Sequence, residues 1–271
     1  MTTRHTHTGR PHGAHTAIEF RAFFEAMSLP WALPWLLRAP RGDGHPVLLL
    51  PGFMAGDVSM IALEIFLRNR GYDVSTWGFG RNIGFQPKHA KALEQKIRYM
   101  HYKTGKKVSL VGWSLGGVFS LYGAHQAPEC VRSVITLGSP VSTDASGERN
   151  VPRFLKAMYR LVAHPMGTMV HQNRPEGKLL TRGATLTTPL SCLYGIGDGV
   201  VPPQEATIDG NPTLHENIRV PASHLGMGFN PMVMWIVADR LAQAEGQWRP
   251  FEPSGVSAFV YRTLTHELLP V

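Results

Sequence analysis

The sequence predicts an α/β fold, a mostly parallel six-stranded sheet with helices on both faces. Between about residues 45 and 243, short apolar runs alternate with longer segments whose apolar residues recur at helical spacing. One such run leads directly into a serine among glycines and then into a helical segment. This alternation favours a parallel sheet, because each helix is then the crossover between two strands. Right-handed crossovers place the carboxyl ends of all strands at one edge, where active sites of open α/β sheets form.

The first two strands and two helices are predicted from apolar patterning. The first strand is the continuous apolar run in "PVLLLPGF", which is typical of a strand buried on both faces. The next helix, in "SMIALEIFLRNRG", has Met60, Leu63 and Leu67 at helical spacing and ends at Gly71. The second strand is "YDVSTWGFG", and the amphipathic helix after it is "HAKALEQKIRYMHYKTG", ending at Gly105.

The remaining elements follow in the same order. The third strand is "KVSLVGWS" and its helix is "GGVFSLYGAHQAPE". The fourth strand is "CVRSVITLGSP", the fifth is "TPLSCLYGIG", and the sixth is "ENIRV". The final predicted helix is "NPMVMWIVADRLAQ". Between the fourth and fifth strands, residues 141–188 interrupt the alternation and are predicted to form a small helical cap or lid.

The chain is predicted to be a polar, disordered arm over residues 1–26 followed by a single domain over residues 27–271. The arm has low hydrophobicity and four histidines. The segment "SLPWALPWLLRAPRG" is apolar and interrupted by prolines. It is predicted to be an irregular cover on the surface, and a membrane-touching segment is the alternative.

The charge and the composition restrict the partners. The formal net charge is +8 and no nucleic-acid motif accompanies it, so nucleic acid is not an expected partner. The basic charge does favour peripheral contact with an anionic membrane. The sequence has no apolar run of membrane-spanning length, no secretory apolar core and no cysteine framework, which together predict a cytoplasmic location.

A candidate nucleophile is Ser114, in "VSLVGWSLGGVFS". It directly follows a predicted buried strand and directly precedes a helix, a turn in which the backbone of a serine is strained. Gly112 and Gly116 allow the strand and the helix to approach closely around it. A plain turn favours glycine or asparagine at the strained position, so the serine indicates a nucleophile.

A serine nucleophile needs a base, and the base needs an acid that orients it. His224 follows the sixth strand and is expected at the same sheet edge as Ser114, whereas His215 precedes that strand and is expected at the opposite edge. Asp198 follows the fifth strand at the productive edge and is the predicted acid. The alternatives for the acid are Asp209, Glu205 and Asp144.

Backbone amides at the same edge are predicted to form an oxyanion hole. Leu115 begins the helix after Ser114, where backbone donors favour developing negative charge. The loop after the first strand is expected to supply the second donor, from Phe53, with Met54 as the alternative.

With these residues placed, the chain resembles the α/β-hydrolase superfamily in its lipase and esterase branch. The matching pieces are "LLLPGF", "GWSLGG", "GDGVVP" and "SHLGM", in the family's order of serine, aspartate and histidine. The first piece departs from the His-Gly of many relatives. The resemblance implies a serine hydrolase that cleaves small-molecule or lipid carboxylic esters through an acyl-enzyme on Ser114, with no metal or organic cofactor. Acyl transfer and thioester hydrolysis by the same triad are the alternatives, and a non-catalytic binding protein is disfavoured because the triad is intact.

The predicted substrate pocket draws on the strand ends and on the insertion. Met54 and Trp113 are expected to line it, together with Phe154 and Met158 from the apolar side of an amphipathic helix. That helix is interpreted equally as a lid, which would also suit a lipid surface, or as a helix packed on the core. The loop after the second strand is interpreted equally as a substrate contact, through Arg81 or Asn82, or as structural.

Overall fold

The structure is a computed structural model that describes residues 21–141 and 186–265. Six parallel strands form one sheet in the order β2-β1-β3-β4-β5-β6. The strand bounds are β1 Pro46–Leu50, β2 Asp73–Thr76, β3 Val108–Trp113, β4 Val131–Leu137, β5 Leu190–Gly195 and β6 His215–Val220. The predicted α/β class and parallel sheet are therefore confirmed.

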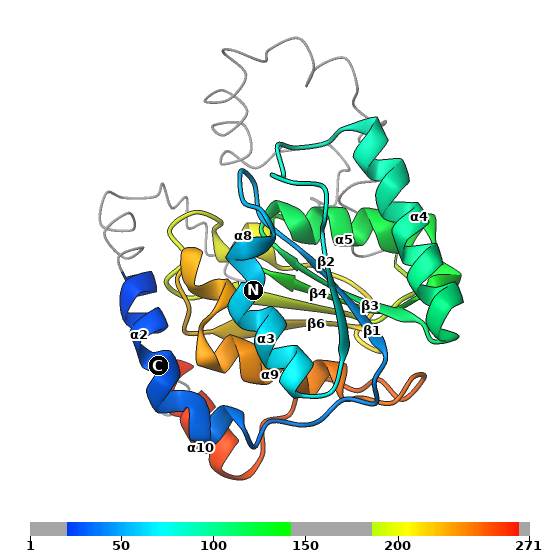
Figure 1. The fold of residues 1–271 in the computed structure, drawn as a ribbon. Coiled ribbons are helices and arrows are strands. Elements are labelled where there is room, and N and C mark those ends of the chain that lie inside the picture. The colour runs from blue at the N-terminus through cyan, green and yellow to red at the C-terminus, as the bar shows by residue number, and fades with distance from the viewer. Residues whose placement is uncertain (1–20, 142–185, 266–271) are drawn as a thin grey trace, which may run out of the picture.

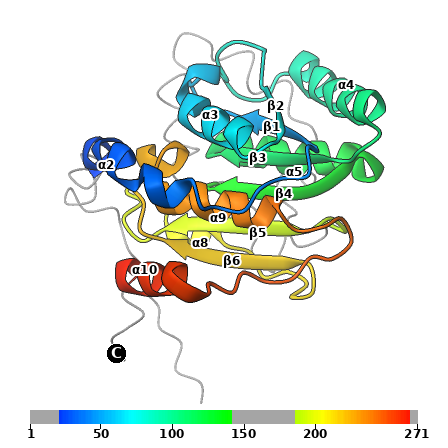
Figure 2. The ribbon, with the colours of Figure 1, turned by 60° about the horizontal axis from the view of Figure 1, so that its bottom comes forward.

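Helices cover both faces of this sheet (Figures 1 and 2). Their bounds are α2 Arg21–Leu36, α3 Ile61–Asn69, α4 Pro87–Thr104, α5 Leu115–Gln126, α8 Pro203–Ala206, α9 Pro231–Leu241 and α10 Gly255–Thr265. Short 3-10 turns lie at Asp57–Met60, Pro128–Cys130 and Leu225–Gly228. As predicted, α4 ends at Gly105, which takes the left-handed conformation at φ 66°.

Two apolar cores lie on the two faces of the sheet. Side chains of successive strand residues point to opposite faces, so Val47 and Leu49 join one core while Leu48 and Leu50 join the other. The first core is completed by α3 and α9 and the second by α4 and α5. The uninterrupted apolar run of β1 is thus explained by burial on both sides.

The structure corrects the expectation for the N-terminal segment. Helix α2 begins at Arg21, inside the range expected to be an arm, and continues into the segment expected to be irregular, as far as Leu36. Its two internal prolines, Pro30 and Pro34, are exposed. The opposite side of the helix packs on α9, where Trp35 stacks on Trp235 with ring centroids 5.7 Å apart. Tertiary packing therefore outweighs the cost of proline in this helix.

The C-terminal expectation also changes, because α9 is followed by α10. Helix α10 packs beside β6 at the end of the sheet (Figure 2). The Tyr261 hydroxyl donates a hydrogen bond to the Arg219 carbonyl at 3.0 Å. The tail, to which the sequence assigned no role, thus covers the edge strand. Among the described helices, none combines the length and apolar character needed to cross a membrane.

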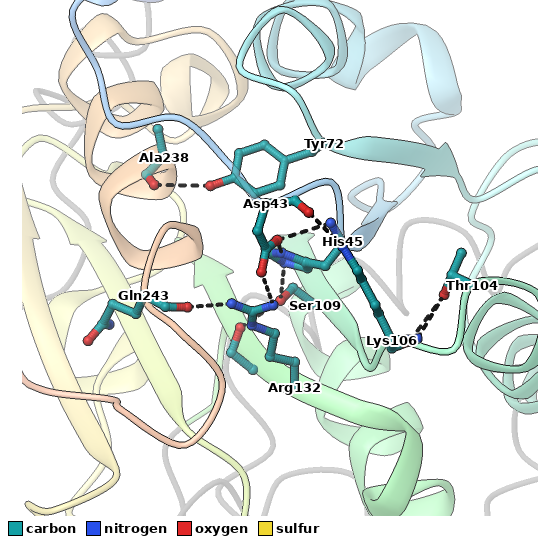
Figure 3. A network of polar contacts seen from close by, with 10 residues as sticks. Asp43, His45, Tyr72, Thr104, Lys106, Ser109, Arg132, Ala238 and Gln243 are labelled. Atoms are coloured by element: carbon teal, nitrogen blue, oxygen red, sulfur yellow. Dashed lines mark hydrogen bonds and ion pairs between the residues drawn. The ribbon is translucent and has the colours of Figure 1, made fainter.

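A polar network ties together the amino-terminal ends of β1, β3 and β4 (Figure 3). His45 is fully buried, with Nδ1 2.6 Å from Asp43 Oδ1 and Nε2 2.9 Å from Ser109 Oγ. Arg132 donates a 2.8 Å hydrogen bond to the other oxygen of Asp43. Burial acts to raise the pKa of Asp43, but the hydrogen bonds from Arg132 and His45 outweigh it and hold that pKa below its ordinary value. The network lies at the sheet edge opposite Ser114, where His45 is buried while the side chain of Asp43 is 51% exposed. Its contacts join three strands, which is a structural role.

This network predicts a loss of stability in mild acid. Burial lowers the pKa of His45, and the hydrogen bond to Asp43 offsets that only in part. The unfolded chain therefore binds a proton at His45 more readily than the folded chain below about pH 6.5, the ordinary pKa of histidine. We expect the melting temperature to fall as the pH drops from about 6.5 to about 5. His45→Asn, which retains a donor toward Asp43 but does not titrate, should flatten this dependence.

The measurement is a set of melting curves between those pH values. His101→Gln, at a partly exposed position on α4, is the control and should retain the parent's pH dependence. Equal slopes for the parent and His45→Asn would assign the acid loss to other groups, of which buried His215, also with a lowered pKa, is the first candidate.

Candidate active site

Ser114 occupies the turn between β3 and α5 with a strained backbone. Its φ of 54° and ψ of −120° are rare for a residue with a side chain. The neighbouring glycines are required sterically. A Cβ on Gly112 would lie 2.4 Å from the Gly116 backbone, and one on Gly116 would lie 2.1 Å from the Leu50 carbonyl oxygen. The predicted elbow is therefore present, with the serine directly at the N-terminus of α5.

His224 and Asp198 converge on Ser114, as the sequence predicted. The His224 Nε2 lies 3.1 Å from Ser114 Oγ, and its Nδ1 lies 2.8 Å from Asp198 Oδ2. Asp198 Oδ1 accepts hydrogen bonds from the amides of Val200 at 2.9 Å and Val201 at 2.7 Å. The side chains of Ser114, His224 and Asp198 are all buried. The arrangement resembles a serine-histidine-aspartate relay, in which the aspartate fixes the tautomer of the ring.

The alternative residues lie elsewhere. His215 is the first residue of β6, at the opposite sheet edge, and its Nε2 lies 3.0 Å from the Leu186 carbonyl. Asp209 is exposed in the loop before β6, and Glu205 belongs to α8. Asp144, and the pocket candidates Phe154 and Met158 with the rest of the insertion helix, lie outside the described residues.

The loop after β1 contains the two residues predicted as alternatives for the second oxyanion donor. The Met54 amide donates to the Asn82 carbonyl at 2.8 Å, and Met54 itself has a φ of 58°. Within the described part of the chain, the Phe53 amide makes no hydrogen bond, which favours Phe53 over Met54 as a donor to substrate. Leu115, the other predicted donor, is the first residue of α5.

Asn82 holds this loop in place. Its side chain is buried, and the side-chain Nδ2 donates to the Pro51 carbonyl at 2.8 Å. Its backbone N–H donates to the Ala55 carbonyl at 2.9 Å. Of the two interpretations from the sequence, the structural one is supported for Asn82. No sequence pattern marks such a contact, because it depends on how two loops meet.

Two further residues support His224, and the sequence analysis did not assign them this role. The Trp113 indole N–H donates to the His224 carbonyl at 3.0 Å, although Trp113 was expected only as a pocket residue. Gly138, at the end of β4, has a φ of 53°. A Cβ there would lie 2.8 Å from Asp198 Oδ2 and 3.3 Å from His224 Nδ1, so glycine leaves room for the pair. Gly138 directly follows β4, at the same sheet edge as Ser114. This position in the sequence is the signal that could have indicated its role.

Known proteins share this architecture. Residues 46–165 match the family model described as the alpha/beta hydrolase fold. Lipase B of Aspergillus fumigatus aligns with a TM-score of 0.55 at 15% identity, over 85% of this chain and 59% of the lipase. The chain has the alpha/beta hydrolase fold. The fold that the four motifs indicated is thus confirmed. The Bacillus licheniformis lipase BlEst2 aligns with this chain at a TM-score of 0.50 and 19% identity, over 76% of this chain and 95% of the lipase.

One curated relative is similar in sequence to part of the chain. It is described as the pimeloyl-[acyl-carrier protein] methyl ester esterase of Citrobacter koseri. The two are 31% identical over 106 residues, which are 39% of this chain. The match spans only 40% of the length of that esterase.

Proposed function

We propose that the protein hydrolyses carboxylic esters through an acyl-enzyme on Ser114. The observation that carries the proposal is the buried hydrogen-bonded chain from Asp198 through His224 to Ser114 at the active edge of the sheet. A serine hydroxyl is a weak nucleophile by itself, and a histidine base within hydrogen-bond reach activates it. The strained turn presents that hydroxyl beside the amino end of α5.

The proposed steps use only this chain, the ester and water. His224 Nε2 takes the Ser114 proton while Oγ attacks the acyl carbon, and Asp198 stabilises the imidazolium. The amides of Phe53 and Leu115 donate hydrogen bonds to the oxyanion. The intermediate then releases the alcohol, which leaves with the proton from His224. Water, deprotonated by His224, attacks the acyl-enzyme, and the acid leaves from the regenerated Ser114 hydroxyl.

We propose that the acyl group of the ester substrate is apolar. Exposed apolar side chains adjoin the reacting residues: Met54 is in the oxyanion loop, Leu225 follows His224, and Ile196 lies two residues before Asp198. Burying a methylene group contributes about 0.8 kcal/mol, so several such contacts favour longer acyl chains.

The test is a series of p-nitrophenyl esters from acetate to laurate, with and without an added alcohol as acyl acceptor. We expect release of nitrophenol and free acid, with kcat/KM rising along the series. If a new ester were the main product in the presence of the alcohol, the activity would be acyl transfer and not hydrolysis. Absence of turnover of every ester and of a matched thioester, by a protein with normal circular dichroism, would overturn the proposal.

We also propose that the exposed side of α2 contacts an anionic lipid surface. Large apolar side chains gather on this side: Phe23, Phe24, Met27, Trp31, Leu33 and Leu37. Exposed arginines lie at both ends of the helix, at Arg21 and Arg38, while Glu25, the single acid of the helix, is buried. Apolar side chains flanked by cations fit the headgroup boundary of an anionic membrane.

We expect the protein to co-sediment with phosphatidylglycerol vesicles. Trp31→Ser combined with Phe24→Ser should weaken binding by roughly tenfold or more, because each aromatic contributes about 1.5–3 kcal/mol when buried. The matched control is Tyr102→Ser on α4, since Tyr102 is 86% exposed and Trp31 is 87% exposed. Equal vesicle binding by the double variant and the control would reject the proposal that this side of α2 contacts the lipid. Concentration-dependent dimers that the double variant abolishes would instead assign it to a second copy of the chain.

A further inference from the structure

Helix α2 brings a buried carboxylate against the loop that carries His224. Glu25 Oε1 accepts a hydrogen bond from the Ser223 amide at 2.9 Å, and Oε2 accepts one from Asn230 Nδ2 at 3.1 Å. Ser223 directly precedes His224, and Asn230 is the N-cap of α9. The carboxylate thus joins the two ends of the segment that holds the candidate base.

The loop presents one hydrogen-bond donor to each carboxylate oxygen of Glu25. Asn230 Oδ1 is occupied by the amides of Met232 and Val233, so its Nδ2 is the group that faces Glu25. A carboxylate accepts from both the Ser223 amide and this Nδ2, whereas a glutamine could accept from only one. A Cβ on Gly226 would lie 1.8 Å from Glu25 Oε2, so the loop closes tightly over the carboxylate.

Attachment of α2 by itself does not require this carboxylate. The apolar side of the helix, with the Trp35–Trp235 stack, already packs on α9. Among the described residues, no cation forms an ion pair with Glu25, which instead rests on neutral donors. A buried carboxylate is costly to desolvate, and an apolar side chain would anchor the helix at lower cost.

We infer that Glu25 is a positioning residue, which fixes the backbone at Ser223 so that the His224 ring reaches both Ser114 and Asp198. This inference rests on the proposed function. The hydrogen bond from Trp113 to the His224 carbonyl constrains the loop from the other side. Displacement of a reacting group by about 1 Å can cost about a hundredfold in rate, so a small movement of this loop is enough to matter.

The test compares Glu25→Gln and Glu25→Ala with Trp35→Ala, which loosens α2 without touching the histidine loop. In both Glu25 variants we expect kcat to fall by roughly tenfold to a hundredfold, with KM within about twofold of the parent. The rate at which a fluorophosphonate labels Ser114 should fall in parallel. Trp35→Ala should lower the melting temperature but leave kcat unchanged at a temperature well below melting.

Two results would overturn the inference. One is a parent-like kcat and labelling rate in both Glu25 variants. The other is an equal fall in Trp35→Ala at an equal loss of melting temperature, which would make Glu25 only an anchor of the helix. A parent protein that neither turns over esters nor reacts with the fluorophosphonate would overturn the proposed function instead. In that case hydrogen exchange at the Ser223 amide decides: faster exchange in Glu25→Gln than in Trp35→Ala supports the positioning role, and equal exchange rejects it.

Discussion

Ser114→Ala is expected to lower kcat/KM for ester hydrolysis by roughly a thousandfold or more, while the fold stays intact. The substitution removes the hydroxyl that lies 3.1 Å from His224 Nε2 and leaves no nucleophile to form the acyl-enzyme. Alanine retains a Cβ, so the strained turn at φ 54° is no harder to form than in the parent. The measurement is hydrolysis of a p-nitrophenyl ester together with a circular dichroism spectrum.

Ser120→Ala is the matched control for this prediction. Ser120 is a buried serine of the same helix, α5, and its hydroxyl donates to the Gly116 carbonyl at 2.9 Å. Loss of that bond should cost stability but leave the reaction largely unchanged. Residual activity in Ser114→Ala above about a thousandth of the parent rate, with a normal spectrum, would remove Ser114 from the mechanism.

Asp198→Asn should lower kcat by roughly three to four orders of magnitude. The oxygen of an asparagine would retain the hydrogen bonds from the amides of Val200 and Val201, which turns its NH₂ group toward His224 Nδ1. The ring would then be protonated on Nε2, the atom that must accept the Ser114 proton. The tautomer would be wrong although the geometry is preserved.

The runner-up acid supplies the control. Asp209→Asn, at an exposed position in the loop before β6, should leave kcat within about twofold of the parent. A large loss in Asp209→Asn together with a small one in Asp198→Asn would reassign the acid. Both variants are compared at saturating substrate, so that kcat and KM separate.

The sequence was sufficient to predict the sheet and the convergence of its three polar residues. In a parallel sheet, residues that follow β3, β5 and β6 must meet at one edge, so chain order alone brings Ser114, Asp198 and His224 together. The glycines around Ser114 mark the turn because close backbone approach excludes a side chain there. The periodicity of apolar residues and the residue preferences of turns are local properties, so the amino-acid sequence shows them directly.

The N-terminal helix and the supports of the site could not be predicted in this way. Two prolines argue against helix between residues 21 and 36, and tertiary contacts with α9 and with the histidine loop stabilise it. Glu25 meets Ser223 across 198 residues of chain, and Asn82 meets Pro51 across 31. Contacts of this kind depend on where loops arrive after folding, and no spacing in the sequence encodes them.

Mass mapping of a covalent adduct shows directly whether Ser114 is the nucleophile. The protein is incubated with a fluorophosphonate that mimics the tetrahedral intermediate, digested, and searched for modified residues. We predict a single adduct on Ser114, formed fast in the parent and at a rate lower by orders of magnitude in Asp198→Asn. An adduct on any other residue, or ester hydrolysis that continues after Ser114 is fully modified, would show that Ser114 is not the nucleophile.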